Sequence, residues 1–226
     1  MSAAEPIDLD AVRRRYLDQL LVPDPRAAWA AVEHALARGV APRRIYLDVL
    51  TPAMVEIGRL WETARIGVAQ EQLATQITQM VLARLAPVLD EHTDATASTH
   101  PRRRALVAGT PNELHAIGAR MVADFLQASG WDVVLLGPDT RTAEIVDATR
   151  DTHPHVVALS TSLSSNLLSA GRVFSALRHL ALEPKPLLVA GGRAYDGLPD
   201  RARVMGADVF AADPEHLLRE LALRLH

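Results

Sequence analysis

Short apolar runs alternate with amphipathic stretches throughout the second half of the chain, and this alternation constrains the fold more than any other feature. The expected strands are 105–109, 133–137, 156–160, 186–192 and a shorter one at 208–211. Helical spacing of apolar residues predicts helices near 115–129, 142–151, 165–181 and 214–224. Continuously apolar strands are typical of a parallel sheet with helices on both faces. We therefore predict an α/β, Rossmann-like domain over 104–226, with flavodoxin-like strand order.

The first half of the chain has a different pattern, in which apolar residues recur at helical spacing. The expected helices are 8–22, 25–38, 41–63 and 67–89. Asp24 is a candidate N-cap, because it precedes Pro25 at the first turn of the second helix. Short connections favour antiparallel neighbours, so residues 1–90 are predicted to form an all-α four-helix bundle that acts as a cap. Residues 91–103 are polar and lack periodicity, which is typical of a linker.

The composition excludes several classes of site. Cysteine is absent, which rules out disulfides, thiolate metal sites and thioether attachment of a bilin or haem. A formal net charge of -3 argues against a general nucleic-acid surface. No stretch approaches the roughly 18 uninterrupted apolar residues of a spanning helix, and the N-terminus has no apolar signal core. We therefore expect a cytoplasmic protein without a membrane partner.

Loops of small or polar residues follow the predicted strands and carry the candidate chemistry. They are Gly109–Gly118 after the first strand, Ser160–Ser164 after the third and Gly191–Tyr195 after the fourth. The carboxyl ends of parallel strands share one edge of the sheet, so these loops are expected to converge there. A glycine pair after a strand lets a flat or extended group lie against the backbone.

The first of these loops resembles a known family. Glu113-x-His115-x-x-Gly118 is similar to the Asp-x-His-x-x-Gly signature of base-off, His-on cobalamin-binding domains, with Glu in place of Asp. The Ser-rich loop and the Gly-Gly pair follow at matching spacing. The resemblance implies that His115 is the lower axial ligand of cobalt and that Glu113 accepts the proton of its other ring nitrogen. It further implies that four residues line the pocket for the displaced nucleotide tail: Ser160, Ser164, Gly191 and Gly192.

A second resemblance lies in the helical half. Nine residues separate Trp61 from Glu71, and Gln72 follows, which resembles the Trp-x9-Glu-His cap motif of cobalamin-dependent light-sensing repressors. The resemblance implies that Trp61 and Glu71 crowd the upper face of the corrin around an adenosyl group. The alternative is a tryptophan in the bundle core with a solvated Glu71. Gln72 and Glu62 stand where the repressors place histidines, and no N-terminal helix-turn-helix module is expected, so direct DNA binding is not predicted.

Three functions fit a cobalamin held between a helical cap and an α/β domain. The first is a photoreceptor, in which light cleaves the cobalt–carbon bond of adenosylcobalamin and changes contacts within a homo-oligomer or with an output protein. In a subtype of it, a bilin such as biliverdin is held non-covalently as a second chromophore. The alternative is a corrinoid methyl-carrier protein of a methyltransferase system. The third is a binding or storage module. In none of them is the chain itself an enzyme.

Overall fold

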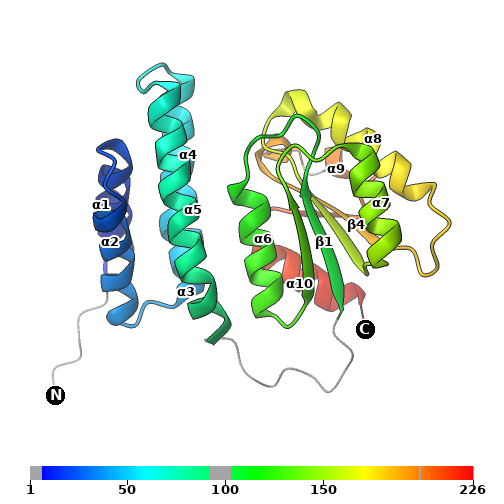
Figure 1. The fold of residues 1–226 in the computed structure, drawn as a ribbon, viewed down its shortest axis with the longest axis horizontal. Coiled ribbons are helices and arrows are strands. Elements are labelled where there is room, and N and C mark those ends of the chain that lie inside the picture. Colours follow the sequence, from blue (N-terminus) through cyan, green and yellow to red (C-terminus); the bar gives the residue numbers. More distant parts are fainter. Residues whose placement is uncertain (1–6, 92–102, 199, 226) are drawn as a thin grey trace. The chain divides into compact units, whose positions relative to one another are not determined.

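The structure is a computed structural model that describes residues 7–91, 103–198 and 200–225. The chain divides into two compact units, residues 1–93 and 94–226 (Figure 1). Each unit is described by itself below. Most of the predicted linker, residues 92–102, lies outside the described residues, and Glu91 ends the last helix of the first unit.

The first unit is helical, as its periodicity predicts. Its elements are α1 (Leu9–Leu21), α2 (Pro25–Ala37), α3 (Pro42–Arg44), the π-helix η1 (Ile45–Leu50), α4 (Thr51–Glu62) and α5 (Val68–Glu91). Asp24 caps α2, because its carboxylate accepts hydrogen bonds from the backbone N–H groups of Arg26 and Ala27, each at 3.0 Å. In the core of this unit the hydroxyls of Tyr16 and Thr78 form a buried hydrogen bond of 2.9 Å.

The third predicted helix, residues 41–63, corresponds to three consecutive elements, α3, η1 and α4. Pro52 explains why the helical turns ahead of it are wider than those of an α-helix. Proline has no N–H to donate, and its ring crowds the preceding turn. The π-helical segment η1 lies just ahead of Pro52. The Thr51 hydroxyl donates to the Tyr46 carbonyl oxygen at 2.9 Å, which satisfies one acceptor in this segment.

The second unit is a five-stranded parallel sheet. Its strands are β1 (Arg104–Gly109), β2 (Asp132–Gly137), β3 (Val156–Ser160), β4 (Leu187–Gly191) and β5 (Val209–Ala211), in the order β2-β1-β3-β4-β5. The helices of this unit are α6 (Ile117–Ala128), α7 (Thr142–Thr152), α8 (Leu167–Arg178), α9 (Asp200–Val204) and α10 (Pro214–Arg224). The predicted flavodoxin-like order is therefore confirmed.

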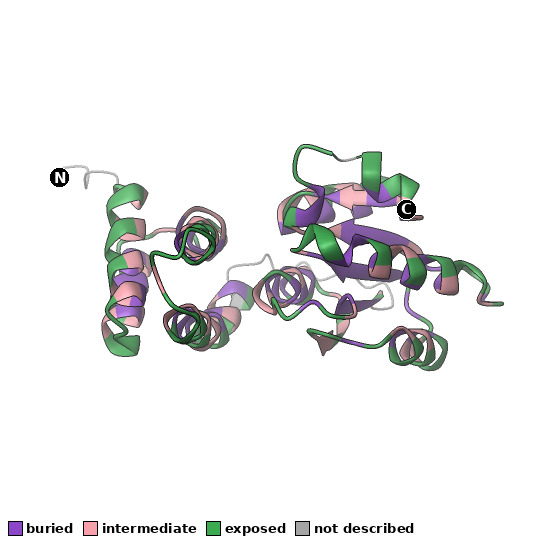
Figure 2. Ribbon diagram, turned by 90° about the horizontal axis from the view of Figure 1, so that it is seen from above, coloured by how far each residue is buried: buried purple, intermediate pink, exposed green. Residues whose placement is uncertain are grey.

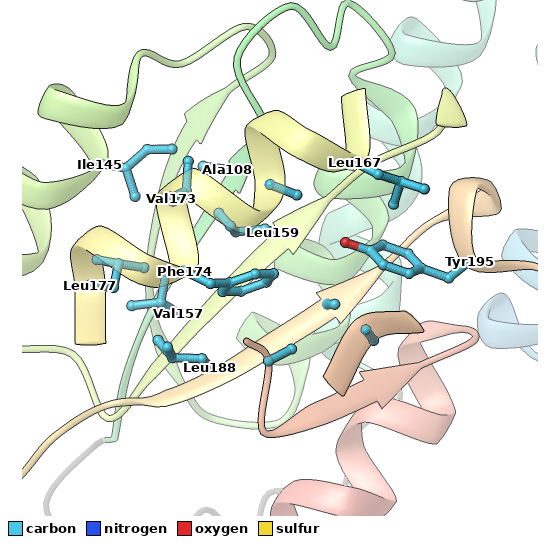
Figure 3. Close-up of a cluster of buried hydrophobic side chains, with 14 of the residues drawn as sticks. Ala108, Ile145, Val157, Leu159, Leu167, Val173, Phe174, Leu177, Leu188 and Tyr195 are labelled. Carbon is cyan, nitrogen blue, oxygen red and sulfur yellow. The ribbon is translucent and has the colours of Figure 1, made fainter. Parts of the chain in front are cut away.

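Helices cover both faces of the sheet, and Figure 2 shows the strands buried between them. On one face, apolar residues of β1, β3 and β4 pack against α7 and α8, with Phe174 and Tyr195 among the largest buried side chains (Figure 3). On the other face, Ala105 and Val107 of β1 pack in a cluster with residues of α6 and α10. Alternate residues of one strand thus serve opposite cores, which explains why these strands are continuously apolar.

Several elements differ from the prediction. The strand β2 is only partly buried although its sequence is apolar, because it lies at the edge of the sheet and pairs with β1 alone. The helix α9 was not predicted, and its five residues are too few to show a periodicity. The helix predicted from residue 115 begins at Ile117, so His115 stands in the loop before it. Within the described ranges, no helix combines the length and apolarity of a membrane span.

Candidate functional site

A tight turn directly after β1 begins the loop that carries His115. The Glu113 N–H donates to the Thr110 carbonyl oxygen at 3.0 Å, and Asn112, the third residue of the turn, has a φ of 67°. Proline at the second position and a residue that tolerates positive φ at the third are the signature of a type II turn. Pro111 and Asn112 meet this requirement, so the local sequence itself bends the chain towards the sheet edge.

The side chain of Glu113 is fully buried, and both of its oxygens accept hydrogen bonds. Oε2 accepts from the backbone N–H groups of Ser162 and Leu163, at 2.7 and 3.0 Å, and from the Asn166 amide at 3.2 Å. Oε1 accepts from the His115 backbone N–H at 3.2 Å and contacts Nδ1 of the His115 ring. The carboxylate therefore links the loop that carries His115, residues 109–118, to the loop after β3. The loop of residues 109–118 is called the ligand loop below.

These donors determine the ionisation of Glu113. Burial raises the pKa of a carboxyl group, but the hydrogen bonds from His115, Leu163 and Ser162 outweigh burial and lower the pKa of Glu113 from 4.5 to about 2. Near neutral pH the group is a carboxylate, which only accepts hydrogen bonds. Nδ1 of His115 must then be the donor, so Nε2 is the ring nitrogen whose lone pair can bind a metal. The His115 side chain is 46% exposed, so a metal ion can approach its ring.

The other strand-end loops converge on the same edge, as the fold predicts. Ser160 pairs with Gly191 across β3 and β4, and Gly118 lies beside Ser160, because a Cβ at Gly118 would be 3.1 Å from the serine Oγ. Gly192 has a φ of 104°, and a Cβ there would lie 2.3 Å from the Thr161 carbonyl oxygen. Only glycine fits this position, so the Gly-Gly pair keeps the backbone of the two loops in close contact.

Three buried hydroxyl groups lie near these loops. They belong to Thr110 after β1, Thr161 after β3 and Tyr195 after β4. The Thr161 and Tyr195 hydroxyls lie close enough to interact with each other, whereas the Thr110 hydroxyl has no hydrogen-bond partner among the described residues. Buried polar groups without partners are rare in folded proteins and call for an explanation. All three hydroxyls follow neighbouring strands, β1, β3 and β4, at the same edge of the sheet as His115.

The structure brings together most of the residues predicted for the α/β unit. Glu113, Ser160, Gly191 and Gly192 belong to the interlocked loops, whereas Ser164 is exposed on the short helix η2 (Ser164–Asn166). Whether these residues hold a ligand tail stays a prediction.

The remaining two predicted residues belong to the helical unit. Trp61 lies near the end of α4 and is 42% exposed, so it is not a core residue of the bundle. Glu71 lies in the first turn of α5, where its Oε1 accepts a hydrogen bond from the Thr75 hydroxyl at 3.0 Å. Within the helical unit by itself, the alternative interpretation of Trp61 as a tryptophan of the bundle core is therefore wrong.

Sequence reasoning missed two residues that hold the ligand loop. Asn166 is buried and donates to the Asn112 carbonyl oxygen at 3.1 Å as well as to Glu113. Asp139, after β2, accepts a hydrogen bond from the Asn112 N–H at 2.7 Å. Neither belongs to a motif, and only the known strand order, which puts the loops after β2 and β3 beside the loop after β1, could have suggested them.

Known proteins resemble the chain over most of its length. It is 23% identical over 188 residues to trimethylamine corrinoid protein 1 of Methanosarcina acetivorans, which covers 83% of this chain and 84% of the relative. It is 30% identical over 153 residues to the HTH-type transcriptional repressor CarH of Myxococcus xanthus, which covers 68% of this chain but 48% of the repressor. Among solved structures, the monomethylamine corrinoid protein of Methanosarcina barkeri matches with a TM-score of 0.80 at 21% identity, over 96% of this chain and 100% of that chain, and it shows the same fold.

Family models agree with these similarities. A B12 binding domain model matches residues 12–86, and a second B12 binding domain model matches residues 103–222. The second match alone spans more than half of the 226 residues. The protein therefore belongs to the B12-binding domain family.

Proposed function

We propose that this chain holds cobalamin in the base-off, His-on state, with Nε2 of His115 as the lower ligand of cobalt. The observation that carries the proposal is the contact between the half-exposed His115 ring and the buried carboxylate of Glu113. A carboxylate on one ring nitrogen fixes the tautomer and orients the other nitrogen towards a metal. Imidazole is a suitable ligand for cobalt.

The loops around His115 also fit the cofactor. Gly118 lacks a side chain where one would press on Ser160, and Gly192 lets the loop after β4 lie directly against the Thr161 backbone. We propose that Ser160, Gly191 and Gly192 receive the displaced nucleotide tail, and that Ser164 contacts it from η2. When bound, cobalamin supplies a cobalt–carbon bond that exchanges a methyl group or breaks under light. The residues of the chain hold and orient the cofactor, and we propose that they perform no catalysis of their own.

The comparisons favour a methyl carrier over a light sensor as the use of this cofactor. The methylamine corrinoid proteins match over more than four fifths of both chains, whereas the match to the repressor CarH covers 48% of that protein. In this function the methyl group stays on the cofactor until a methyltransferase partner receives it, so the partner is another protein.

A light sensor is the second candidate, and the position of Trp61 favours it. An indole that is 42% exposed near the end of α4 offers an apolar surface to an adenosyl group, which a methyl carrier does not need. The similarity to the repressor CarH agrees with this reading. Here we propose that adenosylcobalamin is the native form, that a homo-oligomer or an output protein responds, and that biliverdin can bind non-covalently as a second chromophore.

The ligation itself is tested with a nitrogen label. Protein grown on ¹⁵N is loaded with cobalamin of natural isotopic composition and reduced to the cob(II)alamin state. A protein nitrogen on cobalt splits the electron paramagnetic resonance lines into doublets, whereas the base of the cofactor splits them into triplets. We expect doublets for the wild type and their loss in His115→Ala. Triplets in the wild type would exclude ligation by His115.

The two uses are separated by one pair of experiments on the loaded protein. Adenosylcobalamin-loaded protein, with and without biliverdin, is illuminated while its absorption and molecular mass are followed. Methylcobalamin-loaded protein is given a thiol acceptor together with a corrinoid-dependent methyltransferase. Photoconversion with a change in assembly supports the sensor, and methyl transfer without light supports the carrier. Trp61→Ala should alter the photoconversion and leave methyl transfer unchanged.

A further inference from the structure

In the turn between β2 and α7, Asp139 forms hydrogen bonds with the ligand loop. Its carboxylate accepts a hydrogen bond from the Asn112 N–H at 2.7 Å, and its own N–H donates to the Glu113 carbonyl oxygen at 2.8 Å. Both contacts are to the backbone of the two residues that precede Leu114 and His115. Asp139 therefore holds the loop without touching the imidazole.

The strands are shaped so that this turn can approach. The pairing of β1 with β2 shifts register between Val107 and Ala108, so that Ala108 pairs with Gly137. Gly109 has no Cβ, and one placed there would lie 2.9 Å from the Cα of Pro138. Asp139 itself has a φ of 48°, a conformation that aspartate tolerates better than most residues. Bulges that redirect a chain beside a functional loop are common in sheets.

Asp139 also completes the backbone hydrogen bonding of Asn112 and Glu113. The Asn112 carbonyl is bound by Asn166, and the Glu113 N–H is bound by the Thr110 carbonyl. The two remaining backbone groups, the Asn112 N–H and the Glu113 carbonyl, are the ones that Asp139 binds. The loop is thus held from the β3 side by Asn166 and from the β2 side by Asp139.

We propose that Asp139 is a positioning residue for the cobalt ligand, which acts through Asn112 and Glu113 to keep His115 at the distance that coordination requires. This inference rests on the proposed ligation of cobalt by His115. Its physical reason is that the Asp139 carboxylate restrains Asn112 while its backbone N–H restrains Glu113, three and two residues before His115. The loss of the charged acceptor lowers the fraction of His115 in the coordinating position.

The test measures how firmly His115 stays on cobalt. Protein labelled with ¹⁵N and loaded with cob(II)alamin is acidified, and the midpoint for loss of the nitrogen doublet is recorded. Asp139→Gly removes the acceptor but keeps the positive φ, and we expect it to weaken ligation about tenfold. That weakening raises the midpoint by about one pH unit, because protonation of His115 competes with cobalt. Asp139→Ala serves as a second truncation.

Two control variants separate positioning from general effects. Asp139→Asn keeps an oxygen acceptor and should restore the midpoint of the wild type. Asp151→Ala removes an exposed carboxylate from the neighbouring helix and should leave the midpoint unchanged. A wild-type midpoint in both truncations would overturn the inference while leaving ligation by His115 intact. A wild type without the doublet would instead overturn the proposed function.

Discussion

Glu113→Gln provides the most direct test of the site, because it removes one charge at almost constant volume. Oε2 receives three donors, so the amide oxygen of glutamine is expected at that place. The amide nitrogen then occupies the place of Oε1, where it faces the His115 N–H and drives Nδ1 to act as an acceptor. That tautomer carries its proton on Nε2, which blocks metal coordination.

The magnitude follows from the pKa of Glu113. A pKa lowered from 4.5 to about 2 on folding corresponds to about 3 kcal/mol of stability for the ionised group. Because the folded pKa is the lower one, this contribution is complete above pH 4.5 and is lost as the pH falls towards 2. Glu113→Gln lacks the charge at every pH. The variant should therefore be about 3 kcal/mol less stable than the wild type at pH 7 and nearly equal to it at pH 2.

The assay is urea unfolding of the apoprotein, followed by the fluorescence of Trp131 in the α/β unit. Trp29 and Trp61, both in the helical unit, are replaced by phenylalanine so that one unit is observed. Other carboxyl groups titrate in both proteins and cancel in the difference. Glu183→Gln, at an exposed carboxylate in the loop before β4, is the matched control and should change stability by less than about 0.5 kcal/mol. A difference between wild type and Glu113→Gln that stays constant from pH 7 to pH 2 would refute the reasoning.

Four further variants test the packing of the two units. Gly192→Ala forces a Cβ to within 2.3 Å of the Thr161 carbonyl oxygen and should destabilise the α/β unit by about 3 kcal/mol in urea unfolding. Gly197→Ala, at a positive φ with open space around it, should cost only about 1 kcal/mol, and equal losses would show that the contact is unimportant. Asn166→Leu leaves the Asn112 carbonyl without its side-chain donor and removes one of the three donors to Oε2 of Glu113, so it should cost about 2 kcal/mol, with loss of the ¹⁵N doublet after loading. Trp61→Ala should change the unfolding free energy of the apoprotein by less than about 1 kcal/mol, since the indole is already 42% exposed. A larger loss of stability would show that Trp61 contributes to the core of the bundle.

The fold was predictable from the sequence because periodicity and caps act locally. Pro25 after Asp24 located the start of α2 to the residue, and the apolar runs located β1 and β3 to within one residue. The π-helical segment before Pro52 was not predicted, since a proline within a long helical pattern predicts a break, a kink or a wider turn alike. The exposure of β2 depends on its place in the strand order, which no single segment of sequence specifies.

The site was predictable only where the residues are close in sequence. Glu113 and His115 are two positions apart, so a motif could identify both. Asn166 stands 53 residues from Glu113, and Asp139 stands 27 residues from Asn112. Their roles arise from the parallel sheet, which brings the ends of β2 and β3 to the two sides of β1.

The substitution of Glu for Asp in the motif has a structural explanation in these contacts. One oxygen of Glu113 must reach the His115 ring while the other reaches the backbone N–H groups of Ser162 and Leu163. A glutamate is longer than an aspartate by one methylene group, so the loop can meet both sets of donors from a backbone position set back from the loop after β3. Asp139 and the turn at Asn112 fix that backbone position from the opposite side. The carboxylate of Glu113 therefore holds the His115 ring, while Asp139 and the turn at Asn112 hold the backbone that carries Glu113.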